Sequence, residues 1–177
     1  PESLTVIDSN AFWGCMNLNQ IDIPDSVTEI QSNAFGICPE IKNVDLHEGI
    51  VKLGAKIFTG TGITELNIPD SVVEYEAFAA GCTELTTLKI PAHILEDEIP
   101  DGFFQDCKSL DVLSFIHDGI VSIGYNAFSG TSVTELEFHE GLESIGNFAF
   151  SGCTELRYCI IPETVTSVGD GVFKGCS

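Results

Sequence analysis

Residues 12–35 read FWGCMNLNQIDIPDSVTEIQSNAF, and this stretch spans one whole period of a repeat that runs through the chain. Phe12 begins the period and Phe35 begins the next one. Further Phe residues follow at an interval of about 23 residues, at Phe58, Phe78, Phe104, Phe128, Phe150 and Phe173. A fixed period in this range is the sequence signature of a solenoid, in which each copy forms one coil and buries its apolar side against its neighbours.

A second apolar pattern follows each Phe. In the first copy it consists of Leu18, Ile21 and Ile23, and the later copies keep the spacing apolar-x-x-apolar-x-apolar. The last two positions alternate with polar residues, which predicts a short strand with one buried face. Equivalent strands should lie parallel, because each is reached by the same full turn of chain. Pro24 and three equivalent prolines follow such strands and keep them short, since proline has no N–H for the hydrogen-bond ladder.

The repeat also predicts the domain organisation. A further apolar pair, Val27 and Ile30 in the first copy, precedes the next Phe, so a coil has about seven inward positions. That number is too small for an independent core but sufficient when coils stack. We therefore expect a single solenoid over residues 1–177, and, because neither end has a polar cap, a segment of a longer array. The coils should start near residues 1, 24, 47, 69, 91, 117, 139 and 162.

The eight Phe anchors, with Cys and Pro in register, resemble the BspA-like leucine-rich repeats, also called the Treponema pallidum type, over essentially the whole chain. The asparagine ladder of commoner leucine-rich repeats is missing here, as it is in that family. The resemblance implies a mostly-β or α/β-type solenoid, a right-handed curved superhelix with a parallel sheet on its concave face and irregular or short 3-10 segments elsewhere. It also implies a cell-surface or extracellular location and a role in adhesion, with a host or cell-surface protein as partner.

The charge of the chain restricts its partners. The 27 Asp and Glu residues outnumber the 7 Lys and Arg, and the net charge of −20 opposes binding to nucleic acid or to an anionic membrane. No apolar run has the length of a membrane span, so we expect no membrane insertion of this segment. The sequence contains no nucleophile with a base, no phosphate-binding glycine loop and no zinc-protease motif. We therefore expect a protein that is not an enzyme and needs no cofactor.

The cysteines follow the repeat. Five of the seven stand three residues after a Phe, as Cys15 and Cys38 do, and none forms a Cys-x-x-Cys pair. Stacked cysteines would point their side chains in parallel, which is poor geometry for a disulfide. The favoured interpretation is a column of buried thiols, with disulfides as the alternative.

A carboxylate recurs in the turn after the strand, in a Pro-Asp-Ser form at residues 24–26 and a His-Glu-Gly form at residues 47–49. Ordinary turn chemistry explains both forms. Alternatively, stacked carboxylates repel one another and could bind Ca²⁺ or a basic partner. His117 and His139 occupy the same slot of neighbouring coils, which makes Zn²⁺ ligation conceivable. Because His47 occupies that slot without a neighbouring His, a structural turn residue is the better interpretation and no metal site is predicted.

The default binding surface is the outward side of the predicted strands on the concave face. Tyr158 and Ile160 are unusually apolar for such positions and are candidate anchors. The predicted surface consists of Gln20, Asp22, Asn43, Asp45, Glu65, Asn67, Thr87, Lys89, Val112, Ser114, Glu135, Glu137, Tyr158 and Ile160.

One coil is irregular, because the interval from Phe78 to Phe104 is 26 residues. An insertion in a solenoid maps to a loop on one side, so its acidic residues are either tolerated drift or a contact site. These residues are Glu96, Asp97, Glu98 and Asp101. The predicted function is a non-catalytic protein-binding or adhesion scaffold. The alternatives are an array that self-associates end to end and a cation-dependent carbohydrate-binding module.

Overall fold

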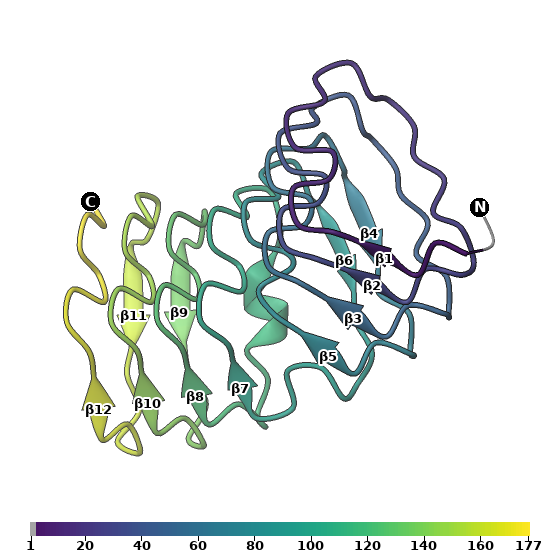
Figure 1. Cartoon of the computed structure of the whole chain (residues 1–177). Helices are drawn as coiled ribbons and strands as arrows, with labels where there is room; N and C mark the ends of the chain where they lie inside the picture. The colour runs from purple at the N-terminus through teal and green to yellow at the C-terminus, as the bar shows by residue number, and fades with distance from the viewer. Residues whose placement is uncertain (1–2) are drawn as a thin grey trace. The chain divides into compact units, whose positions relative to one another are not determined.

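The computed structural model describes residues 3–177, which form a mostly-β solenoid with twelve short strands and one 3-10 helix in that range (Figure 1). Paired strands lie 22 to 24 residues apart in sequence, as Val6 and Glu29 do at 23, which confirms the predicted period of about 23. The chain divides into two compact units, one ending at Ile94 and one beginning at Leu95.

The N-terminal unit contains two parallel sheets. The larger has the strands β1 (Val6–Ile7), β2 (Glu29–Ile30), β3 (Lys52–Leu53) and β5 (Glu74–Tyr75) in that order. The smaller pairs β4 (Glu65–Asn67) with β6 (Thr87–Lys89). Every pairing joins one coil to the next, so no strand forms a hairpin with its sequence neighbour.

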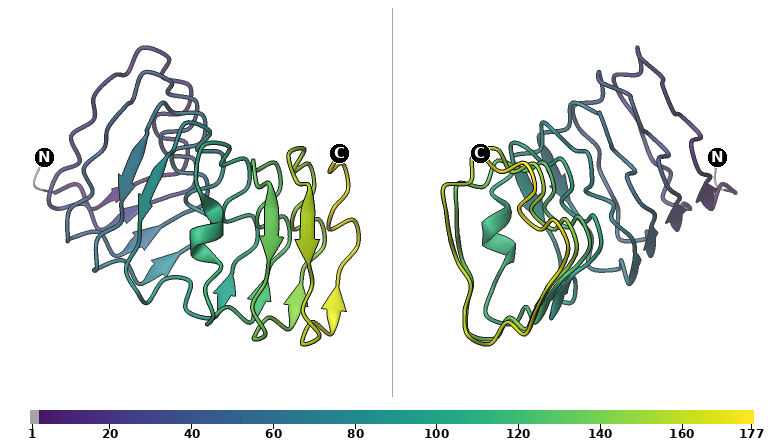
Figure 2. Two further views of the ribbon diagram at one scale, coloured as in Figure 1. Left: turned by 180° about the vertical axis from the view of Figure 1, so that it is seen from behind. Right: turned by 90° about the vertical axis from the view of Figure 1, so that its left-hand side faces the viewer.

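The C-terminal unit repeats this arrangement. Its larger sheet has the strands β7 (Glu98–Ile99), β8 (Ser122–Ile123), β10 (Ser144–Ile145) and β12 (Ser167–Val168). Its smaller sheet pairs β9 (Glu135–Glu137) with β11 (Tyr158–Ile160). The two sheets of this unit lie on different sides of the coil, and the end-on view in Figure 2 shows its coils overlying one another.

The larger sheets come from the second apolar pair of each coil, where the sequence predicted no strand. The predicted strands form only in β4, β6, β9 and β11, whereas residues 20–22 and 43–45 form none. Both of these segments contain Asp, which is depleted in strands and absent from β4, β6, β9 and β11. In β4 the buried Leu66 is flanked by exposed Glu65 and Asn67, as the predicted alternation requires.

The irregular coil departs furthest from prediction. In place of a strand, it has the 3-10 helix η1 (Val112–Phe115). Val112 is only 2% exposed, so its assignment to the binding surface was wrong. A 3-10 helix repeats its side chains every three residues, so Val112 turns toward the core while Leu113 is left half-buried. Ser114 remains exposed, and its Oγ donates a hydrogen bond to the Asp111 carbonyl (2.8 Å).

A column of stacked Phe rings forms the centre of each unit. In the N-terminal unit the rings of Phe35 and Phe58 lie 5.6 Å apart, centroid to centroid. In the C-terminal unit Phe128 stacks between Phe104 and Phe150, at 5.3 and 5.1 Å. These spacings are close to the strand spacing of about 4.8 Å. The coil-to-coil pairing therefore brings equivalent rings into contact, in the offset geometry that aromatic pairs favour.

Candidate binding surface

The structure places all of the predicted surface residues except Val112 in exposed positions. The N-terminal unit has Gln20, Asp22, Asn43, Asp45, Glu65, Asn67, Thr87 and Lys89, and the C-terminal unit has Ser114, Glu135, Glu137, Tyr158 and Ile160. Each unit thus has its own part of the surface, and the two parts differ in character.

The N-terminal part is polar. A shallow hollow of about 510 Å³ is lined by residues 19–22 and 43–45, which bring amides and carboxylates together. Further along, the Lys89 ammonium lies 3.2 Å from a carboxylate oxygen of Glu65. That exposed ion pair joins β4 to β6 and neutralises one of the acidic side chains.

The C-terminal part combines acidic and apolar side chains. β9 and β11 pair in register, so Glu135 lies beside Tyr158, and Glu137 beside Ile160. Tyr158 and Ile160 are 47% and 46% exposed. Tyrosine offers a large, rigid and amphipathic contact surface, which is why it is frequent at protein interfaces. A second hollow, of about 250 Å³, lies next to β9 and is lined by Leu113, Ile116 and residues 135–138.

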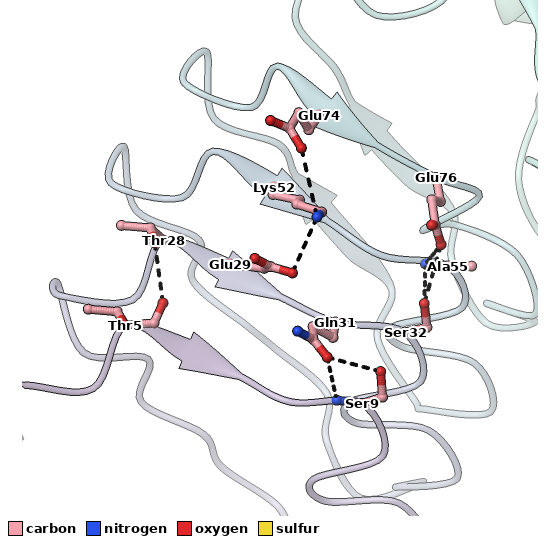
Figure 3. A network of polar contacts seen from close by, with 10 residues as sticks. All are labelled: Thr5, Ser9, Thr28, Glu29, Gln31, Ser32, Lys52, Ala55, Glu74 and Glu76. Carbon is pink, nitrogen blue, oxygen red and sulfur yellow. Dashed lines mark hydrogen bonds and ion pairs between the residues drawn. The ribbon is translucent and has the colours of Figure 1, made fainter.

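A polar network that the sequence analysis missed covers the larger sheet of the N-terminal unit (Figure 3). The Lys52 ammonium lies 3.5 Å from Glu29 and 3.8 Å from Glu74, so it links three successive strands. Beside it, Glu76 accepts hydrogen bonds from the Ser32 hydroxyl (3.2 Å) and the Ala55 N–H (3.0 Å). The sequence did contain a signal for this network, because Glu29, Lys52 and Glu74 are separated by 23 and 22 residues, close to the repeat period. Exposed ion pairs contribute little to stability, so the network mainly sets the charge pattern of this sheet.

The turn histidines have a structural role. The Nδ1 atom of His47 accepts a hydrogen bond from the Gly49 N–H (3.0 Å), and its Nε2 lies 3.0 Å from the Pro24 carbonyl of the preceding coil. His117 makes the equivalent pair of contacts. Each of these rings therefore closes its own turn and ties that turn to the preceding coil. Among residues 3–177, no three His, Cys, Asp or Glu side chains are grouped as a metal site would require.

The cysteine thiols form hydrogen bonds along the Phe column. Cys38 donates to the Phe12 carbonyl (3.1 Å), and Cys153 donates to the Phe128 carbonyl (3.3 Å). Where Thr131 replaces Cys, its hydroxyl donates to the same Phe128 carbonyl (2.8 Å). The seven cysteines all lie within residues 3–177 and form no disulfide with one another there, and Cys15 is exposed. Burial raises the pKa of the Cys38 and Cys153 thiols above the ordinary value of 9.0.

The acidic segment of the irregular coil is partly built into the sheet. Glu98 forms part of β7, and the Asp97 carbonyl accepts hydrogen bonds from the N–H groups of Val121 (2.7 Å) and Ser122 (3.3 Å). Asp101 accepts one from the Tyr125 N–H (2.6 Å) through a carboxylate oxygen. The side chains of Glu96, Asp97, Glu98 and Asp101 are nevertheless exposed. No helix in the described part of the chain is long and apolar enough to cross a membrane.

Stacked coils with a Phe column and short parallel strands define a leucine-rich-repeat solenoid. The chain belongs to the family described as the BspA type leucine-rich repeat region, whose sequence profile matches residues 1–80 and 71–177. No curated protein matches the sequence significantly.

Three solved structures have the same fold. A leucine-rich repeat protein from Bacteroides ovatus is 22% identical, with a TM-score of 0.71, and the match covers 99% of this chain and 51% of that one. A leucine rich cell surface protein from Faecalibacterium prausnitzii is 24% identical, with a TM-score of 0.63 and coverage of 98% and 62%. The leucine-rich repeat protein of T. pallidum is 24% identical, with a TM-score of 0.59 and coverage of 98% and 70%. The chain thus spans about half of the first of these proteins and 62% of the second.

Proposed function

We propose that the chain is a non-catalytic binding scaffold, the repeat region of a cell-surface or secreted protein, whose partner is another protein. The observation that carries this proposal is the exposed outer face of the smaller sheet in the C-terminal unit, which includes the apolar pair Tyr158 and Ile160. Both hollows on this surface are partly open to solvent, whereas small-molecule sites bury most of their ligand. Similarity to a leucine rich cell surface protein supports the proposed location.

Tyr158 and Ile160 are the proposed anchors of the contact. Large exposed side chains that become desolvated at the centre of an interface contribute most of its binding energy. The neighbouring carboxylates of Glu135 and Glu137 favour a partner with a basic surface, and the net charge of −20 accelerates encounter with such a partner.

The test is a Tyr158→Ser/Ile160→Ser double variant, compared with the wild type for capture of extracellular proteins and then for affinity to each captured protein. We expect the affinity to fall at least about tenfold, or 1.4 kcal/mol, with an unchanged melting temperature. The matched control is Val121→Ser/Val168→Ser, which removes apolar residues that are 38% and 48% exposed, outside the smaller sheet, and should retain full affinity. Equal affinity of the test variant and the wild type would exclude this pair as the anchor.

A further inference from the structure

β9 has a free edge because the preceding coil lacks a strand. Among the described strands β9 pairs only with β11. In a regular coil, residues 112–114 would form the strand on its other side, but they belong to η1. An unpaired strand edge exposes N–H and C=O groups that can hydrogen-bond to another chain.

The hollow beside β9 lies along this free edge. Four consecutive residues, 135–138, line it together with Leu113 and Ile116. Successive side chains of a strand point to opposite faces, so four in a row can line one hollow only if the backbone edge itself borders it. Space of about 250 Å³ is therefore present where the missing strand would lie.

The hollow has two chemically distinct sides. Leu136 and Phe138 point inward, at 1% and 8% exposure, and the half-buried Leu113 and Ile116 form the opposite apolar wall. Glu135 and Glu137 point outward into solvent. An added strand would therefore meet apolar side chains on its inner face and carboxylates on its outer face.

Within residues 3–177, the carboxylates of Glu135 and Glu137 have no cationic partner. In the matching sheet of the N-terminal unit, Glu65 of β4 is neutralised by Lys89 of β6. In the C-terminal unit, the residues paired with Glu135 and Glu137 are Tyr158 and Ile160, and neither carboxylate forms an ion pair within residues 3–177. The two exposed carboxylates are therefore available for ion pairs with basic side chains of a bound partner.

A buried polar atom of His139, close in sequence to β9, also lacks a hydrogen-bond partner among the described residues. Its Nδ1 accepts from the Gly141 N–H (3.0 Å) in the usual way, but its buried Nε2 has no hydrogen-bond partner among the described residues. In His117, the corresponding Nε2 contacts the carbonyl of Leu95, 22 residues earlier. At the same offset of 22 residues, the carbonyl for His139 would belong to His117, which lies two residues beyond the end of η1. The irregular coil thus coincides with both an unpaired strand edge and an unsatisfied polar atom.

We propose that the free edge of β9 binds an extended segment of a partner protein in which Lys or Arg alternates with aliphatic residues. The segment adds a strand beside β9, its basic side chains contact Glu135 and Glu137, and its aliphatic side chains contact Leu113 and Ile116. Strand addition of this kind takes affinity from backbone hydrogen bonds and specificity from alternate side chains. The inference rests on the proposed function and specifies the chemistry of the partner segment.

The test uses three fluorescent peptides: acetyl-Lys-Leu-Lys-Val-Lys-amide, its counterpart with Glu for Lys, and the basic peptide with alternate amides N-methylated. Fluorescence anisotropy should show that the first binds at least about tenfold more tightly than the other two. The acidic peptide meets like charges, and the methylated one cannot form the backbone hydrogen bonds. Equal binding of the methylated peptide would overturn strand addition.

Protein variants locate the site. Glu135→Lys/Glu137→Lys should lower the affinity for the basic peptide at least about tenfold. Leu113→Lys places a longer side chain from η1 in the hollow and should lower the affinity by a similar factor. The control Glu143→Lys/Asp170→Lys makes the same charge change at exposed positions outside the smaller sheet and should retain the binding. If the control lowers the affinity for the basic peptide equally, the effect comes from net charge alone and the proposed site at β9 is wrong. If the basic peptide fails to bind while Tyr158→Ser/Ile160→Ser still lowers affinity for a captured protein, this inference fails and the proposed function stands.

Discussion

At the scale of single residues, the repeat specifies which side chains stack. The Phe, Cys or Thr at a given position of one coil meets its equivalent from the next coil, so ring stacking and thiol hydrogen bonds recur along the column. The contribution of each residue depends on how completely its neighbours enclose it.

Phe128→Ala tests the Phe column. Phe128 is fully buried and stacks on both sides, so the substitution should lower the free energy of unfolding by about 3–5 kcal/mol. Phe12→Ala is the control, because this half-buried ring stacks on Phe35 alone among the described contacts and should cost less than half as much. Urea denaturation measures both values, and equal losses would contradict the stacked-column account.

The thiols provide a second test at this scale. Brief alkylation of the native protein with iodoacetamide should modify exposed Cys15 and spare Cys38 and Cys153, as peptide mass spectrometry would show. Because burial raises the pKa of the two buried thiols, the folded state holds their protons to higher pH than the unfolded chain does. Their stabilising contribution is therefore complete below pH 9 and is lost as the pH rises through the raised pKa values. Rapid alkylation of Cys153 at neutral pH, or stability that rises above pH 9, would contradict this burial.

At the scale of elements, the irregular coil shows what the sequence could and could not predict. The Phe period predicted the solenoid, and the apolar triplets predicted the exposure of every proposed surface residue except the buried Val112, because stacking imposes one geometry on every regular coil. Which apolar pairs become strands was not predictable, since elements of two or three residues depend on a few hydrogen bonds. The break at η1 had no clear signal, because Val112 and Leu113 are adjacent apolar residues but so are Cys159 and Ile160, which lie in strand β11. The free edge of β9 had none, because it depends on the loss of a strand elsewhere in the chain.

Val112→Asp tests η1 directly. Because Val112 is buried in the structure, the substitution places a carboxylate in the core and should lower the free energy of unfolding by about 3 kcal/mol or more. The neighbouring Ser114→Asp changes an exposed position and should cost less than about 0.5 kcal/mol. Thermal denaturation of both variants gives the comparison. A harmless Val112→Asp would mean that this segment is an exposed strand after all.

At the scale of the whole molecule, the main feature is the net charge of −20. Part of the turn chemistry already uses the carboxylates, since Glu48 accepts a hydrogen bond from the Ser71 N–H (3.2 Å). The binding scaffold proposed above requires no metal.

Measuring the melting temperature after removal and addition of Ca²⁺ distinguishes the proposed protein-binding scaffold from a cation-dependent carbohydrate-binding module. After treatment with a chelator, about 1 mM Ca²⁺ should leave the melting temperature within about 1 °C, because a ligand that does not bind the folded state cannot stabilise it. A rise of roughly 5 °C or more, as expected for a dissociation constant near 10 μM, would favour the cation-dependent alternative.

The most direct test of protein binding by the strand surface is backbone hydrogen exchange of the chain with and without a captured protein partner. The account predicts slower exchange in β9 and β11 and in η1 when the partner is bound, with unchanged exchange in β7, β8, β10 and β12. Protection confined to those four strands, or no protection anywhere in the chain, would contradict it.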